Sequence, residues 1–246
     1  MVSNFKTRTI TSFILFTIFI LFYILQLNHL FLIVIFAIVY YELFDNKIVN
    51  TYFLIISLLS YFFFLNYIDF TYNFIINNSI FIFIFFICLL LITFAKMNIF
   101  VSKIMFNLFI LICFFLFTLL YIHNFNIFFI VILFTSINDV LAYIIGSYFK
   151  GPKVIPSISP NKTWSGTLSS YLLSVALLFY FFDFAIIYNI TLPITFFIGD
   201  IYFSRIKRIL NIKDYGYLIK GHGGFLDRFD SSFLSLSFSF LMLLFI

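Results

Sequence analysis

Charged residues are rare in this chain, yet they concentrate in the segment 200–230, which holds 10 of the 23 in 31 residues. Asp200 ends an apolar run, and Asp227 and Asp230 begin the next one, in places where an uncompensated charge is costly. Carboxylates beside basic residues and glycines are suited to metal-assisted phosphoryl or nucleotidyl transfer. Mg²⁺ binds a few carboxylate oxygens and substrate phosphates, while Lys and Arg neutralise the remaining phosphate charge.

A second polar cluster lies upstream. Asn138 and Asp139 fall well inside the apolar segment 126–148, where a carboxylate costs roughly 2.5–3.5 kcal/mol on insertion scales. Such a residue indicates a functional site, with a helix-to-helix hydrogen bond as the structural alternative. The loop that follows contains Ser159, Lys162 and Thr163, and a Ser or Thr there can cap the next helix and present its N-terminus to a phosphate.

The elements that must position these clusters are membrane helices. The 246 residues are 64% hydrophobic, 24% aromatic and 9% charged, which excludes an average soluble domain. The apolar runs are unbroken rather than alternating, which excludes a transmembrane β-barrel. Cys88 and Cys113 lie in apolar stretches without metal or disulfide spacing, and they are interpreted as small hydrophobes. The fold class is therefore an all-α, polytopic integral membrane protein.

About nine transmembrane helices are predicted. They lie near 10–26, 30–43, 48–66, 76–95, 104–122, 126–148, 165–183, 184–203 and 231–246. Residues 1–125 show no striking polar group inside a helix and are expected to form a scaffold, dimerisation and lipid-contact region. Residues 126–246 are expected to form the catalytic region, with cytoplasmic loops 149–164 and 204–230.

The positive charges predict the orientation. With a cytoplasmic N-terminus and nine spans, all 14 Lys and Arg fall on the inner side, as the positive-inside rule demands. No small-residue cleavage site follows the first apolar run, so we expect a retained helix rather than a signal peptide. The protein is expected in a bacterial inner membrane with its site facing the cytoplasm. Nucleic acid is not an expected partner, because no soluble basic domain exists to hold it.

Several blocks together resemble the phosphatidate cytidylyltransferases, also called CDP-diacylglycerol synthases. The C-terminal signature comprises Ser204–Arg208, Lys213–Gly216 and Gly221–Ser231, including Gly221-His222-Gly223-Gly224-Phe225-Leu226-Asp227-Arg228. Upstream, Asp139-x-x-Ala142-Tyr143-x-x-Gly146 and Ser159-Pro160-x-Lys162-Thr163-Trp164 are similar to two further blocks in the same order. The resemblance covers the chain from Asn138 to Ser232.

This resemblance implies that a phosphatidic acid oxygen attacks the α-phosphorus of CTP, giving CDP-diacylglycerol and pyrophosphate with Mg²⁺ required. It implies that Asp200 and Asp227 bind the metal and that Ser204 and Lys207 contact the reacting phosphates. We further assign Arg208, Lys213 and Arg228 to the triphosphate or lipid phosphate, Ser159, Lys162 and Thr163 to the nucleotide, and His222 and Asp230 to positioning the loop. Asp139 and Asp214 complete the expected substrate-binding set.

Four positions depart from the family pattern: Leu141, Ser165, Phe203 and Lys220. Three alternatives stay open from the sequence: an ion-coupled transporter using Asp139 and Asp200, a related CTP-dependent lipid-alcohol kinase, and an inactive relative serving as a membrane scaffold. A homodimer, the acyl-chain preference and the choice between CTP and dCTP are also left open.

Overall fold

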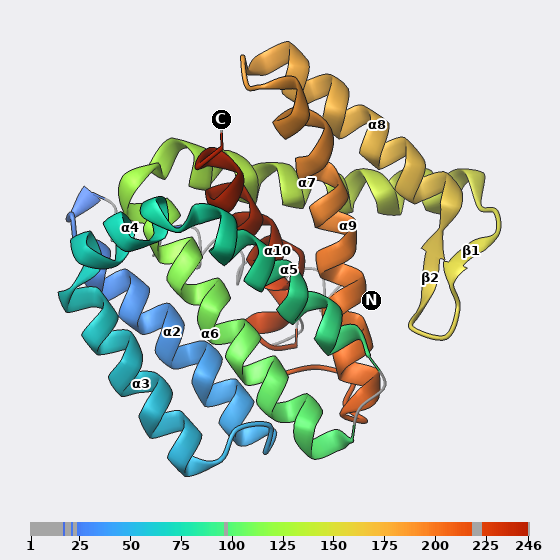
Figure 1. The fold of residues 1–246 in the computed structure, drawn as a ribbon. Coiled ribbons are helices and arrows are strands. Elements are labelled where there is room, and N and C mark those ends of the chain that lie inside the picture. The colour runs from blue at the N-terminus through green and yellow to red at the C-terminus, as the bar shows by residue number, and fades with distance from the viewer. Residues whose placement is uncertain (1–16, 18–20, 22–23, 96–97, 218–222, 246) are drawn as a thin grey trace.

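A computed structural model describes residues 17, 21, 24–95, 98–217 and 223–245 (Figure 1). Within these residues it contains nine helices and one antiparallel hairpin. They are α2 (Asn28–Asp45), α3 (Thr51–Asn66), α4 (Ile68–Asn77), α5 (Ser79–Phe94), α6 (Ile99–His123), α7 (Phe125–Phe149), β1 (Lys153–Ile155), β2 (Ser159–Thr163), α8 (Trp164–Phe181), α9 (Ile186–Ile209) and α10 (Leu226–Leu243). Most of the first expected segment, 10–26, lies outside the described residues.

The all-α, polytopic membrane class is confirmed. Five described helices, α2, α6, α7, α8 and α9, are long and apolar enough to cross a membrane. A sixth span results if α3 and α4, which meet at 87°, are counted as one broken span. Helix α5 is shorter, at 16 residues, and α10 begins with Asp227, Arg228 and Asp230. The expected nine spans therefore exceed the five or six that the described chain supports, and the orientation stays a prediction.

The polar segments contain more regular structure than expected. Helix α9 continues to Ile209, so Ser204, Lys207 and Arg208 project from a helix and not from a loop beginning at 204. No Gly or Pro interrupts this stretch, and basic side chains are favourable at a helix C-terminus. At its other end, the expected loop 204–230 gives way to α10 from Leu226. The expected loop 149–164 contains the β1–β2 hairpin.

Helix α10 lies inside the bundle and packs against α6, α7 and α9 (Figure 1). Its buried serines, Ser231, Ser232, Ser235, Ser237 and Ser239, let neighbouring helices approach closely. At Gly199 of α9, an added Cβ would lie 2.9 Å from the Ser231 carbonyl oxygen. This close contact holds Asp200, the residue after Gly199, against the first turns of α10.

Helices α7 and α8 form an antiparallel pair that carries the hairpin at one end (Figure 1). The pair closes on Gly146 and Gly166, since a Cβ at Gly166 would lie 2.5 Å from the Ala142 carbonyl oxygen. Thr163 caps α8, because its hydroxyl accepts a hydrogen bond from the Gly166 N–H at 3.3 Å. Thr163 therefore marks the start of α8. The close contact between α7 and α8 at the two glycines places the hairpin beside α7.

Candidate active site

A cavity of about 850 Å³ lies between α7, α8, α9 and the start of α10. Its wall includes seven of the residues predicted for the site: Asp139, Ser159, Lys162, Thr163, Asp200, Asp227 and Asp230. Ala142, Leu168, Ile194 and Phe197 make part of the wall apolar. The cavity is therefore amphipathic, with its charged groups gathered from elements that are distant in the sequence.

Asp200 is held by side chains. Lys162, from β2, forms an ion pair with one Asp200 oxygen, and the Ser204 hydroxyl donates to the other at 3.2 Å from the next turn of α9. The Lys162 ammonium also lies 5.5 Å from the centre of the Phe197 ring. Both side chains of the ion pair remain partly exposed, at 24% for Lys162 and 22% for Asp200. A polar reactant that enters the cavity can therefore reach this pair.

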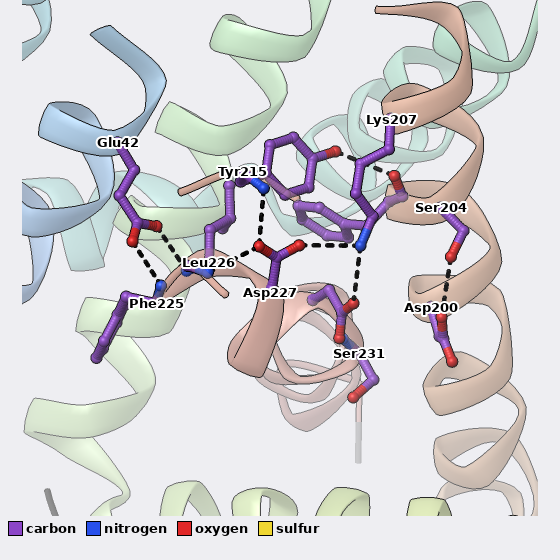
Figure 2. A network of polar contacts seen from close by, with 12 residues as sticks. Glu42, Asp200, Ser204, Lys207, Tyr215, Phe225, Leu226, Asp227 and Ser231 are labelled. Carbon is purple, nitrogen blue, oxygen red and sulfur yellow. Dashed lines mark hydrogen bonds and ion pairs between the residues drawn. The ribbon is translucent and has the colours of Figure 1, made fainter. Parts of the chain in front are cut away.

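Asp227 is held mainly by the backbone. Its Oδ2 accepts hydrogen bonds from the N–H of Tyr215 at 2.7 Å and of Gly224 at 3.0 Å. Its Oδ1 pairs with the Lys207 ammonium at 3.0 Å, and the Asp227 side chain is only 6% exposed (Figure 2). Asp227 therefore ties the chain before α10 to α9 through Lys207.

Asp139 and Asp230 are the other two carboxylates on the cavity wall. The Lys207 ammonium lies 3.9 Å from Asp230, and Asp139, Asp200 and Asp230 repel one another electrostatically. The Ser231 hydroxyl donates to Asp139 at 3.4 Å. Among the described residues, no group of three or more His, Cys, Asp or Glu side chains is arranged to hold a metal by itself. A divalent ion here would need oxygens from a reactant as well.

Six described residues of the predicted set are not on the cavity wall: Ser204 and Lys207, which bind Asp200 and Asp227, and Arg208, Lys213, Asp214 and Arg228. Arg208 donates to the Ile158 carbonyl of the hairpin at 3.3 Å. Lys213 and Arg228 are exposed, and Asp214 packs beside Gly223. The structure therefore does not bring these four polar side chains into the cavity with the others. His222 lies outside the described residues.

Glu42 was not among the predicted site residues. This residue, the only glutamate in the chain, lies inside an apolar run, and its side chain is buried, with 1% of the residue exposed. Its carboxylate accepts hydrogen bonds from the N–H of Phe225 at 2.6 Å and of Leu226 at 3.0 Å. The expectation that residues 1–125 hold no striking polar group within a helix is therefore wrong. A single acid within an otherwise apolar run was the available signal.

Tyr215 is another residue that sequence reasoning did not assign. Its ring is fully buried and its hydroxyl donates to the Phe203 carbonyl at 3.0 Å. Burial raises the pKa of the Tyr215 phenol well above its usual value, so the hydroxyl stays a donor. The Asn46 amide, from just after α2, donates to the Tyr215 carbonyl. Tyr215 thus joins the ends of α2 and α9 to Asp227.

Two departures from the family pattern have a clear structural place. Phe203 is fully buried and packs edge-on against the rings of Phe106 and Tyr215. The Ser165 hydroxyl donates to the Lys150 carbonyl, which ties the start of α8 to the end of α7. Both side chains serve packing or connection in this chain. Lys220 lies outside the described residues.

The helices and the cavity define an integral membrane protein with a pocket between its helices that is lined by charged and apolar side chains. The model of the cytidylyltransferase family matches residues 6–246, and the chain belongs to this family. It is 41% identical over 119 residues to a phosphatidate cytidylyltransferase of Rickettsia conorii, covering 42% of this chain and 52% of that protein. A phosphatidate cytidylyltransferase of Staphylococcus aureus is 38% identical over 104 residues, covering 39% and 40%.

The matched stretch thus spans about half, or less, of the length of these curated relatives. No solved structure matches the chain.

Proposed function

We propose that this protein is a phosphatidate cytidylyltransferase. The observation that carries the proposal is the amphipathic cavity, which joins a cluster of carboxylates and lysines to an apolar wall between membrane helices. A lipid phosphate needs both surfaces at once. Family membership and the names of the relatives from Rickettsia and Staphylococcus support the same activity.

The charge of the cavity suits a divalent cation. The carboxylates of Asp139, Asp200, Asp227 and Asp230 line the cavity. Lys162 on the wall pairs with Asp200, and Lys207 behind it pairs with Asp227, so these six side chains carry a formal charge of −2 when all four carboxylates are ionised. Mg²⁺ usually binds one or two carboxylates and completes its shell with phosphate oxygens and water. The donor set therefore fits Mg²⁺, for which we propose Asp200 and Asp227 as ligands; the bound ion would neutralise phosphate charge.

The reaction we propose joins two polyanions. An oxygen of the phosphatidate phosphate forms a bond to the α-phosphorus of CTP, while the bond from that phosphorus to the bridging oxygen breaks and pyrophosphate leaves. No side-chain nucleophile is needed, and most of the rate gain comes from positioning and electrostatic stabilisation. Lys162 and Lys207 would exchange their carboxylate partners for phosphate oxygens, and Ser204 would orient Asp200.

The reactants would enter from different sides. Ser159 and Thr163 are the two ends of β2 in the hairpin, where the nucleotide is proposed to bind, and the apolar wall near Leu168 and Ile194 would hold acyl chains. We propose a bacterial inner membrane with this end facing the cytoplasm, where CTP is available. A homodimer stays a prediction.

Transfer of a labelled phosphate tests the activity directly. Purified protein receives phosphatidic acid, Mg²⁺ and CTP labelled at either the α- or the γ-phosphate. We expect the α-label to enter a chloroform-soluble product and the γ-label to appear in pyrophosphate. In a parallel reaction with diacylglycerol in place of phosphatidic acid, entry of the γ-label into lipid would instead identify the CTP-dependent lipid kinase. Folded protein that transfers neither label would overturn the proposal.

A further inference from the structure

Glu42 lies where an acid is unfavourable for its own helix. It occupies the last turn of α2, near the negative end of that helix dipole, and it is buried. Both of its carboxylate oxygens are used by another helix: Oε1 accepts from Phe225 and Oε2 from Leu226, across 183 and 184 residues of sequence. The presence of an acid at position 42 is therefore explained by its hydrogen bonds to the start of α10, and not by any benefit to α2.

Glu42 caps α10 from a distance. Phe225 is the N-cap residue of α10, and its own side chain makes no capping hydrogen bond. The first N–H groups of a helix lack partners within the helix, and a negative charge beside them is favourable. Figure 2 shows Glu42 on one side of the first turn of α10, with Asp200 and Ser204 of α9 on the other. The carboxylate thus fixes the end of α10 that carries Asp227.

Two glycines make room for this carboxylate. A Cβ at Gly216 would lie 2.6 Å from Glu42 Oε1, and one at Gly224 would lie 2.8 Å from Glu42 Oε2. Gly224 also donates its N–H to Asp227 at 3.0 Å. The same short segment therefore contacts the buried Glu42 on one side and Asp227 of the cavity wall on the other, with no side chain between them.

We propose that Glu42 is a positioning residue for the reaction, which rests on the proposed cytidylyltransferase function. It fixes Phe225 and Leu226, and through the Gly224 N–H and the first turn of α10 it sets the position of Asp227 and its partner Lys207. Asn46 supports the same segment by donating to the Tyr215 carbonyl. The N-terminal half of the chain thereby takes part in the chemistry through the geometry that it imposes.

The variant Glu42→Gln tests this role, because it keeps the size of the side chain but replaces one acceptor oxygen with a donor. We expect kcat per folded molecule to fall about 10- to 100-fold, as for losses of groups that orient metal ligands, with a higher half-saturating Mg²⁺ concentration. Hydrogen exchange in a peptide covering residues 223–227 should become faster. Asp45→Asn is the matched control: it removes an exposed carboxylate from the same helix, and both measurements should stay within about twofold of the original protein.

The controls separate this inference from the proposed activity. If the unaltered protein transfers no α-label, the proposed function fails; if it is active and folded Glu42→Gln protein keeps its kcat and Mg²⁺ dependence, the positioning role fails. Reduced yield with unchanged kcat per folded molecule would also overturn it, since that result describes a purely structural residue. Should Glu42→Gln not fold, Asn46→Ala decides: a kcat lowered at least about threefold supports the role, and an unchanged kcat contradicts it.

Discussion

Two groups of carboxylates lie close together in this protein, but they are held in different ways. Glu42 and Asp227 accept hydrogen bonds from backbone N–H groups; Glu42 is buried, and the Asp227 side chain is only 6% exposed. Asp139 and Asp200 face the cavity and are held by side chains, those of Ser231 and of Lys162 and Ser204. The first group is here called the anchored carboxylates and the second the open carboxylates.

The difference separates carboxylates that hold the chain in place from carboxylates that can take part in the reaction. A backbone N–H cannot leave its acceptor without moving the chain, so the anchored carboxylates fix Tyr215 and residues 224–226. A lysine ammonium can turn toward a phosphate while its stem stays in place, so the open carboxylates can change partners. Asp227 belongs partly to both groups, because its Oδ2 binds two backbone N–H groups and its Oδ1 binds Lys207. Substitutions should therefore separate loss of activity from loss of stability.

Asp200→Asn is expected to have the largest effect on turnover relative to its effect on stability. It removes an open carboxylate proposed to bind Mg²⁺, and losing one such electrostatic element costs about 10²- to 10³-fold in rate. The fold should remain, since the change also removes charge repulsion with Asp139 and Asp230. Label transfer and the melting temperature in detergent measure the two properties. Near-normal turnover would exclude a metal-binding role, and a large loss of stability would show that Asp200 is itself anchored.

Asp227→Asn is expected to lower both properties. Turnover should fall at least about a hundredfold, because the ligand and the placement of Lys207 are lost together. An Asn amide nitrogen cannot accept a hydrogen bond, so either the two backbone N–H groups or Lys207 loses its partner, at a cost of about 1–3 kcal/mol in unfolding free energy. Label transfer measures the loss of turnover, and unfolding in detergent measures the loss of stability on the same sample. Stability equal to that of Asp200→Asn would remove the distinction between anchored and open carboxylates.

Much of the fold could be predicted from the sequence, because lipid demands long apolar helices and leaves a strong pattern. Segments 104–122 and 126–148 closely match α6 and α7. Short elements and the ends of helices were harder to predict. Helix α4 and the β1–β2 hairpin depend on local packing and turns, which apolar content does not encode. The extension of α9 beyond residue 203 was missed because charged residues were interpreted as loop, although Lys and Arg are good helix formers.

Candidate site residues could be chosen where the residue type and its place in an apolar pattern were themselves unusual. Asp139 was chosen as an acid inside an apolar segment, Lys162 as part of the loop that follows it, and Asp200 and Asp227 as acids at the edges of apolar runs. The structure brings all four to one cavity. Glu42 was missed because its role depends on a contact across 183 residues that no local pattern reveals. The two glycines beside it carry no chemistry themselves, and their importance appears only when the carboxylate is placed against them.

Ser231→Ala should have the smallest effect, and it tests how loosely the open carboxylates are held. The Ser231 hydroxyl donates to Asp139 at 3.4 Å, beyond the usual range for a strong hydrogen bond. The close approach to Gly199 involves the Ser231 backbone, which alanine leaves unchanged. We therefore expect turnover to change by less than about threefold, within the roughly 0.5 kcal/mol of a weak hydrogen bond, and the melting temperature to stay constant. A tenfold loss in the label-transfer assay would mean that Asp139 needs a fixed orientation and belongs with the anchored carboxylates.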